Sequence, residues 1–231
     1  MNNAAPALLE AQHITRRLPE GVTLVQDASL KVERGEFIAI TGPSGSGKSS
    51  LLYLLGLLDR PTEGRVLLEG RDTASLSTAE LANLRLARLG FVFQFHFLLP
   101  EFSTLDNVLI PIRRLGRLKD SAARTQAMKL LEALGMAEAA RKLPEQLSGG
   151  MRQRAAIARA LANDPAIILA DEPTGNLDTR NAAAVFDIFA RLAAEEGRAI
   201  LVVTHDAELA KRANRRIHLV DGRIVSDSRA G

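Results

Sequence analysis

Two uninterrupted apolar runs in the second half of the chain predict the centre of a sheet. Residues 166–170 and 199–203 are apolar at every position, which is the pattern of strands buried on both faces in a parallel sheet. Residues 23–32 and 36–40 alternate in part and are bounded by Gly35 and Gly42. They predict further strands in the N-terminal third.

Between these strands, apolar residues recur at the spacing of amphipathic helices. Two sets follow the i, i+3, i+4, i+7 pattern, one stopped by Gly135 and the other by Gly197: Ala127, Leu130, Leu131 and Leu134, then Val185, Ile188, Phe189 and Leu192. The succession of strand and helix predicts an α/β fold. Residues 75–161 read as mostly helical, and we expect them to form a separate lobe.

The composition bears on the number of domains, on the kinds of site that are possible and on the location of the protein. Of the 231 residues, 46% are hydrophobic and 25% are charged, which fits one globular domain over residues 1–231 with a helical subdomain at roughly 95–161. Cysteine is absent, so disulfides, thiolate metal sites and a catalytic cysteine are excluded. No stretch reaches the ~20 apolar residues of a membrane span. Residues 1–10 lack a secretory leader, so we expect the protein inside the cell.

The charge pattern gives little support to nucleic acid as a partner. The net charge is only +3, and the arginines are spread along the chain. The nearest approach to a basic patch is formed by Arg152, Arg154 and Arg159, for which we expect a solvated helix face.

A glycine-rich loop supplies the first chemical motif. It matches G-x-x-x-x-G-K-[ST] in full, between an apolar strand and a helical run: Gly42, Pro43, Ser44, Gly45, Ser46, Gly47, Lys48 and Ser49, with Ser50 following. Such glycines let backbone N–H groups surround phosphates at a helix N-terminus. We expect Lys48 to bind the phosphates of ATP and Ser49 to bind Mg²⁺. The alternative is a flexible turn with a chance lysine.

Two carboxylates end the first buried strand. Asp171 and Glu172 would lie at the carboxyl edge of the sheet and point to opposite faces. We assign Asp171 to the metal and Glu172 to the attacking water as general base, against the alternative of an acidic loop that caps the strand. His205 ends the other buried strand at the same edge, and a catalytic role is favoured over a structural one.

The motif that separates the remaining classes precedes the acidic strand. On their own, a phosphate loop and an acidic strand end fit kinases, GTPases and helicases equally well. These two motifs therefore do not identify the class of protein. Leu147-Ser148-Gly149-Gly150-Met151, however, resembles the signature of the ABC ATPase superfamily. Ser148 can cap the following helix, and Gly149 and Gly150 expose N–H groups for a second anion site. The resemblance implies a head-to-tail homodimer in which this loop completes the nucleotide site of the opposite subunit.

The resemblance extends over almost the whole chain. It implies a RecA-like P-loop core with an antiparallel β subdomain and an inserted α-helical subdomain. Gln94 matches the glutamine that touches Mg²⁺ and senses the membrane partner, Asp178 matches the loop that packs across the dimer, and His205 matches the switch histidine. Two positions depart from the family pattern: Leu18 stands where an aromatic usually stacks on adenine, and Met151 replaces a glutamine.

Alternating phenylalanines follow the glycine at position 90. Phe91, Phe93, Phe95, Phe97 and Phe102 are five of the eight in the chain. They fit either one buried face of a strand and its loop, or an apolar groove at residues 97–102 for a helix of a membrane subunit.

The nearest resemblance is to the ATPases of lipoprotein-releasing systems, on residues 94–102, 176–181 and 202–211. It implies membrane partners of the LolC and LolE type, and a peripheral position on the cytoplasmic face of the inner membrane. ATPases of macrolide-exporter and FtsE type are the alternative. Because the sequence has no membrane helices up to residue 231, a separate subunit is expected. A soluble ABC ATPase acting on DNA or ribosomes and a non-catalytic ATP-binding module are less favoured.

Overall fold

The two apolar runs form interior strands of the central sheet. In the computed structural model, which describes residues 6–229, its strand order is β10-β9-β3-β8-β7-β6. The strands are β3 (Phe37–Thr41), β6 (Leu89–Phe93), β7 (Ile167–Asp171), β8 (Ala199–Val203), β9 (Arg215–Val220) and β10 (Arg223–Arg229). All pairs are parallel except β9 with β10. Every residue of β8 is buried, as the apolar run predicted.

A second, antiparallel sheet lies beside the first. Its order is β2-β1-β4-β5, from β1 (Leu9–Arg17), β2 (Thr23–Val32), β4 (Glu63–Leu68) and β5 (Arg71–Asp72). Leu9 pairs with Val32 on one side and with Leu68 on the other. The strand predicted at 23–32 is therefore confirmed, whereas the apolar pattern did not reveal β1.

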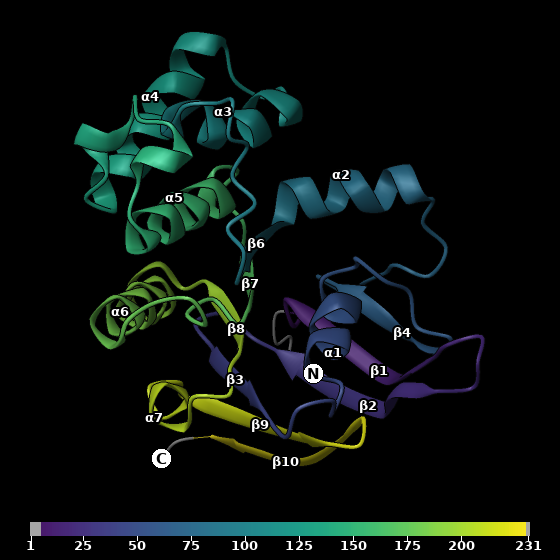
Figure 1. Ribbon diagram of the computed structural model, residues 1–231. Coiled ribbons are helices and arrows are strands. Elements are labelled where there is room, and N and C mark those ends of the chain that lie inside the picture. The colour runs from purple at the N-terminus through teal and green to yellow at the C-terminus, as the bar shows by residue number, and fades with distance from the viewer. Residues whose placement is uncertain (1–5, 230–231) are drawn as a thin grey trace.

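Helices flank the central sheet and build the separate lobe in the upper part of Figure 1. The chain enters α1 (Lys48–Leu55) directly from the glycine-rich loop, and α6 (Thr179–Glu196) and α7 (Ala207–Ala210) follow β7 and β8. The predicted stop at Gly197 is confirmed, since this residue ends α6 in the left-handed conformation.

The lobe consists mainly of three helices, α3 (Thr104–Leu115), α4 (Asp120–Ala133) and α5 (Gly149–Leu161), with two short turns at Ala137–Ala139 and Pro144–Gln146. Helix α2 (Thr78–Arg88) leads into β6 and begins with a capping box between Ser77 and Glu80. Residues 75–161 are mostly helical as predicted, although β6 interrupts them and joins the central sheet.

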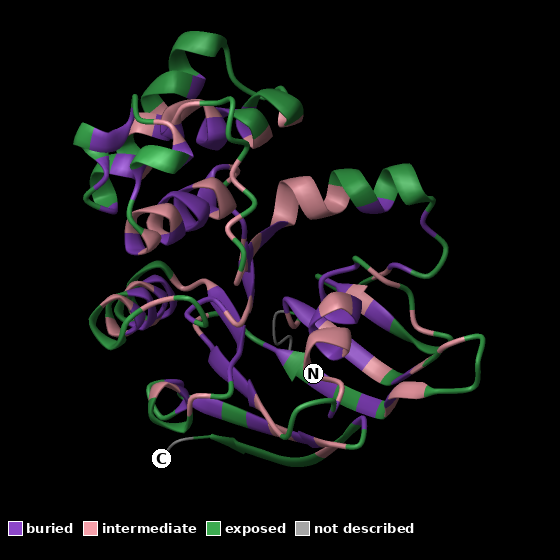
Figure 2. Cartoon of the chain, viewed as in Figure 1, coloured by how far each residue is buried: buried purple, intermediate pink, exposed green. Residues whose placement is uncertain are grey.

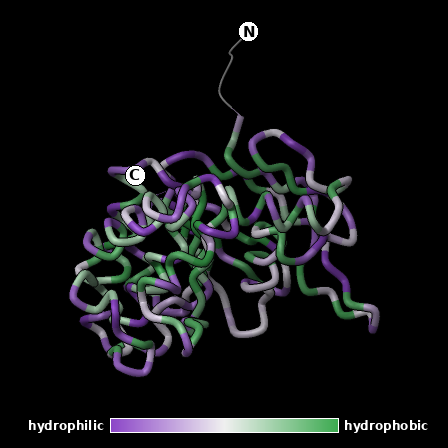
Figure 3. Tube along the Cα trace, turned by 90° about the horizontal axis from the view of Figure 1, so that it is seen from above, coloured by the Kyte–Doolittle hydropathy of each residue, from purple (hydrophilic) through white to green (hydrophobic). Residues whose placement is uncertain are grey.

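The alternation of side chains along the central strands divides the interior into two cores. Phe37 and Ala39 of β3 face one core, which also receives apolar side chains of α3, α4, α5 and α6. Ile38 and Ile40 face the other core, with α1 and the antiparallel sheet. Buried residues follow the strands of the sheet in Figure 2, and green apolar stretches run through the interior in Figure 3.

A buried ion-pair network joins the C-terminal hairpin to the start of β3. Arg215, 7% exposed, donates to both carboxylate oxygens of Glu36 at 3.1 and 3.0 Å. It also binds Asp227 of β10 at 2.8 and 2.7 Å. The sequence pattern gave no sign of this network, because its members come from distant parts of the chain.

One surface prediction is wrong. Arg152, Arg154 and Arg159 lie on α5 as expected, but each is only partly exposed. Arg159 donates to the carbonyl oxygens of His96 and Phe97, and Arg154 donates to that of Leu134. Arg154 and Arg159 thus bind backbone carbonyls, and Nε of Arg152 is buried without a hydrogen-bond partner among the described residues. The three arginines therefore do not form a solvated face.

Within residues 6–229, none of the helices is long and apolar enough to cross a bilayer. The two predicted domain limits, residues 1 and 231, lie outside the described residues. So does the first half of the stretch 1–10, in which no leader was found.

Candidate active site

The glycine-rich loop connects β3 to α1 in a conformation that requires its glycines. Gly42 and Gly47 have φ angles of 145° and 93°. A Cβ atom would lie 2.1 Å from the carbonyl oxygen of Leu219 at Gly42, and 2.1 Å from that of Leu24 at Gly47. Lys48 donates to the carbonyls of Gly42 and Pro43 at 3.0 and 2.8 Å. The loop thus places backbone N–H groups and one ammonium at the N-terminus of α1, an arrangement that suits an anion such as phosphate.

Asp171 at the end of β7 meets two hydroxyls of α1. Ser49 donates to its Oδ1 at 2.9 Å, and Tyr53 donates to its Oδ2 at 2.8 Å. Burial, reinforced by the neighbouring Asp171 carboxylate, raises the pKa of Tyr53 to about 12. The hydroxyl of Ser49 and the carboxylate are hard oxygen donors, which suit Mg²⁺. The sequence predicted Ser49 and Asp171 but missed Tyr53, although its position four residues after Ser49 puts both on one helix face.

Glu172 and His205 come together from adjacent strands. Asp171 pairs with Val203 across β7 and β8, so the residues after the two strands meet at one sheet edge. The Nδ1 atom of His205 lies 2.9 Å from Oε2 of Glu172. Glu172 has a φ angle of 46°, a strained conformation of the kind found at functional sites. Its side chain is 21% exposed, against 74% for His205.

Gln94 follows β6, the neighbour of β7, and lies against the loop that leads to α6. Its Nε2 donates to Oδ1 of Asn176 at 3.4 Å, and Asn176 Nδ2 donates back to the Gln94 carbonyl at 3.3 Å. Among the described residues, Gln94 makes no hydrogen bond with Ser49 or Asp171. The structure thus brings Gln94 to the same sheet edge while its amide faces Asn176.

Asp178 caps the N-terminus of α6. It accepts from the backbone N–H of Asn181 at 2.8 Å and from its side-chain amide at 2.7 Å. The backbone bond is the main cause that lowers the pKa of Asp178. The carboxylate therefore keeps its charge at the helix N-terminus, where it is favourable.

The predicted signature loop begins α5. Ser148 accepts from the Met151 N–H at 3.3 Å, so the predicted cap is confirmed. A Cβ atom on Gly150 would lie 2.4 Å from Oδ1 of Asn181, so a larger residue there would displace the Asn181 side chain of α6. In Figure 1, α5 belongs to the upper lobe and α1 to the lower part of the molecule. Ser148 and the glycine-rich loop are accordingly on different parts of the chain.

The two positions that depart from the family pattern are both partly buried. Leu18 lies in the turn after β1, where its N–H donates to the Val22 carbonyl at 2.8 Å. Met151 packs against the core that receives the apolar side chains of the helical lobe.

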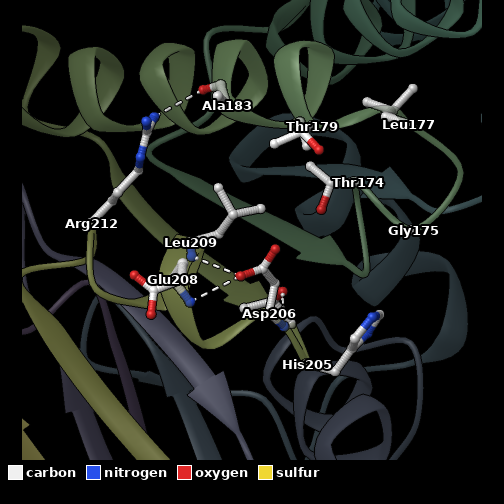
Figure 4. A pocket seen from close by; sticks show the side chains of 12 residues that line it. Thr174, Gly175, Leu177, Thr179, Ala183, His205, Asp206, Glu208, Leu209 and Arg212 are labelled. Carbon is white, nitrogen blue, oxygen red and sulfur yellow. Dashed lines mark hydrogen bonds between the residues drawn. The ribbon is translucent and has the colours of Figure 1, made fainter.

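A cavity of about 500 Å³ opens beside His205, between the start of α6 and α7. Figure 4 shows Asp206 accepting from the N–H groups of Glu208 and Leu209, while Arg212 donates to the Ala183 carbonyl at 3.0 Å. The lining is mainly polar and threonine-rich, and it continues the sheet edge that carries Glu172.

The phosphate loop, the acidic strand end, Gln94 and His205 lie at one edge of the central sheet, and the signature loop lies in the helical lobe. Comparison with known proteins identifies the family. The family model described as ABC transporter matches residues 25–175, which include the glycine-rich loop, the signature and the acidic strand end. The chain belongs to the ABC transporter family. The predicted fold and ATPase class of this family member are thereby confirmed.

Curated relatives cover nearly all of this ABC protein. It is 50% identical to the lipoprotein-releasing system ATP-binding protein LolD of Bordetella pertussis over 98% of both chains. The LolD protein of Aquifex aeolicus is 47% identical, with 95% of this chain and 97% of the relative covered. A solved structure described as the dimeric structure of a bacterial ABC transporter cassette has a TM-score of 0.89 at 38% identity, with 96% and 99% coverage.

Proposed function

We propose that this chain is the ATP-hydrolysing subunit of a lipoprotein-releasing complex, bound to the cytoplasmic face of the inner membrane. The carrying observation is the pairing of Glu172 with His205 at 2.9 Å, at the sheet edge shared with Ser49 and Asp171. Full-length identity of 50% to LolD supports lipoprotein release as the work that hydrolysis drives.

The glycine-rich loop is the proposed binding site for the phosphates of ATP. The backbone of residues 42–47 and Lys48 supply the donors, and Ser50 lies in the first turn of the following helix. Ser49 and Asp171 would hold Mg²⁺, with Gln94 as a further contact. When bound there, the ion would supply charge neutralisation to the phosphates.

Glu172 is the proposed general base. Its carboxylate accepts a proton from the attacking water, and the nearby His205 orients that carboxylate and reaches toward the terminal phosphate. The backbone at Glu172 takes a positive φ just after β7, and in this conformation its carboxylate reaches His205.

A second copy of the chain is the proposed partner at the nucleotide. A related cassette at 37% identity is described as a dimeric post-hydrolysis state bound to ADP and phosphate. Ser148, Gly149 and Gly150 would complete the phosphate site of the opposite subunit, and Asp178 would lie at the dimer contact. In such a dimer, α5 of one subunit would lie opposite α1 of the other. The dimer would therefore account for the separation of these two helices within one chain.

The loop between β6 and α3 is the proposed contact for membrane subunits of the LolC and LolE type. Phe95, Phe97 and Phe102 are 64%, 63% and 43% exposed, whereas Phe91 and Phe93 are partly buried. The interpretation of these phenylalanines as part of a strand therefore holds for Phe91 and Phe93 only. The other three leave an apolar surface that fits a helix of a membrane partner.

Affinity purification of Glu172→Gln from detergent-solubilised cells with MgATP tests this function. We expect two membrane subunits with large periplasmic domains, identified by mass spectrometry. The same purification of Glu172→Gln carrying Phe97→Asp should lose them, whereas Val225→Asp, at a site 57% exposed on β10, should retain them. Recovery without any membrane protein would contradict the proposal and favour the soluble alternative.

A further inference from the structure

The single tyrosine of the chain lies at the candidate metal site. Tyr53 and Ser49 are four residues apart on α1 and share one face of that helix. Their hydroxyls bind the two oxygens of one carboxylate, with Ser49 on Oδ1 at 2.9 Å and Tyr53 on Oδ2 at 2.8 Å of Asp171. The phosphate-loop pattern ends at Ser49 and does not require a tyrosine at this place.

Tyr53 is itself held in place. Its carbonyl accepts from the N–H groups of Leu58 and Asp59 at 2.9 and 3.3 Å, just beyond the end of α1. Its ring packs against the core that includes α1 and the antiparallel sheet. The phenol is thus a fixed hydrogen-bond donor pointing at the end of β7.

We propose that Tyr53 is a positioning residue that holds Oδ2 of Asp171 and so presents Oδ1, beside the Ser49 hydroxyl, to the magnesium ion. The inference rests on the proposed function, in which Asp171 binds the metal. A carboxylate held by one hydroxyl can turn about its Cβ–Cγ bond, and a metal must then immobilise it. The second hydroxyl fixes this rotation beforehand, as outer hydrogen bonds do around many metal ligands.

The first test is the metal dependence of Tyr53→Phe, which keeps the ring and removes the hydroxyl. With ATP present, Mg²⁺ should raise the thermal unfolding midpoint, and the half-saturating Mg²⁺ concentration should be about tenfold higher in the variant. ATP binding in EDTA should be unchanged. A half-saturating concentration equal to or below that of the unmodified protein would overturn the inference.

Thr125→Val is the matched control for this measurement. It also removes one hydroxyl, which donates to the Ser121 carbonyl at 3.0 Å on an exposed face of α4. Because α4 belongs to the helical lobe, the Mg²⁺ response of this variant should equal that of the unmodified protein. An equal loss in Tyr53→Phe and Thr125→Val would also overturn the inference.

The second test is optical and needs no metal. The chain has one tyrosine and no tryptophan, so emission excited at wavelengths that phenylalanine does not absorb comes from Tyr53 alone. A hydrogen-bonded carboxylate quenches tyrosine emission, and Asp171→Asn should therefore be brighter than the unmodified protein. Asp187→Asn, at a carboxylate 70% exposed, should leave the emission unchanged. Equal emission with and without the Asp171 carboxylate would contradict the contact.

Asp171→Asn also separates this inference from the function on which it rests. If Asp171→Asn keeps the normal Mg²⁺ response, the proposed metal role of Asp171 fails. If Asp171→Asn loses the response while Tyr53→Phe keeps it in full, Asp171 binds the metal and the positioning role of Tyr53 alone fails.

Discussion

The Nη1 atom of Arg159 lies 2.5 Å from the carbonyl oxygen of Phe97. The Nη2 atom of the same guanidinium binds the His96 carbonyl at 2.7 Å. The helix that starts at the signature loop therefore also holds the loop with the exposed phenylalanines. Asn107 of α3 fixes the far end of that loop through the backbone of Leu99, Phe102 and Ser103.

Arg159→Ala should loosen this loop. Two carbonyls would lose their donor, and we expect the free energy of unfolding to fall by about 1–3 kcal/mol. Urea denaturation measures this loss, and limited proteolysis should show earlier cleavage near residues 95–97. Arg124→Ala is the control, since its pair with Asp120 is exposed and contributes little to stability. Equal stability and proteolysis in the two variants would refute the role given to Arg159.

Removal of the proposed base should separate hydrolysis from binding. Glu172→Gln keeps the size of the side chain but cannot accept the proton, so phosphate release should fall by roughly 10²–10⁴-fold. ATP affinity should be retained, and gel filtration with MgATP should show a stable dimer. Phosphate release at the normal rate would rule out Glu172 as the base.

Two glycines of the phosphate loop should respond differently to the same substitution. Gly47→Ala would force a Cβ within 2.1 Å of the Leu24 carbonyl, so we expect loss of ATP binding and a stability loss well above 1 kcal/mol. Gly45 also has a positive φ, of 78°, but nothing lies within 4 Å of its Cβ position. Gly45→Ala should therefore cost only about 1 kcal/mol of backbone strain. Calorimetry and ATP titration of both variants check the difference, and equal losses would show that crowding is not the cause.

The pH dependence of stability should contain a term from His96. Burial, followed by the charge of Arg152, lowers the pKa of His96. The folded protein therefore resists protonation of this imidazole, while the unfolded chain accepts a proton near pH 6.5. This contribution is complete above that pH and is lost as the pH falls below it. Urea denaturation at pH values of about 7.5, 6.5 and 5.5, on both sides of the reference pKa of histidine, measures the free energy of unfolding. This free energy should decline less steeply with falling pH in His96→Gln than in the unmodified protein. An identical decline in the unmodified protein would contradict the prediction.

The sequence predicted local features well and distant contacts poorly. Local features depend on residues that are neighbours in the sequence, so their patterns predict them. Examples are the phosphate loop, the strands at 199–203 and 23–32, and the Ser148 cap. Tyr53, Arg159 and Arg215 act through contacts that lie 118, 62 and 179 positions apart. The spacing of apolar residues does not reveal contacts between residues that are far apart in the sequence. For this reason the sequence predicted a solvated face for the arginines of α5.

The alternating phenylalanines illustrate the same limit within one segment. Strand periodicity correctly describes Phe91 and Phe93, which lie in β6. It fails from Phe95 onward because the chain leaves the sheet, and Phe97 takes a positive φ of 47°. The break in conformation turns a partly buried alternation into an exposed apolar loop.

The two faces of the central sheet support the two proposed parts of the nucleotide site, which are the phosphate loop and the signature loop. Leu51 of the phosphate-loop helix packs in one core, and Ile157 of the signature helix packs in the other. A change of side-chain volume beneath the phosphate-loop helix is therefore absorbed in a different core from one beneath the signature helix. The sheet acts as a mechanical partition, so a cavity made under one loop need not displace the other.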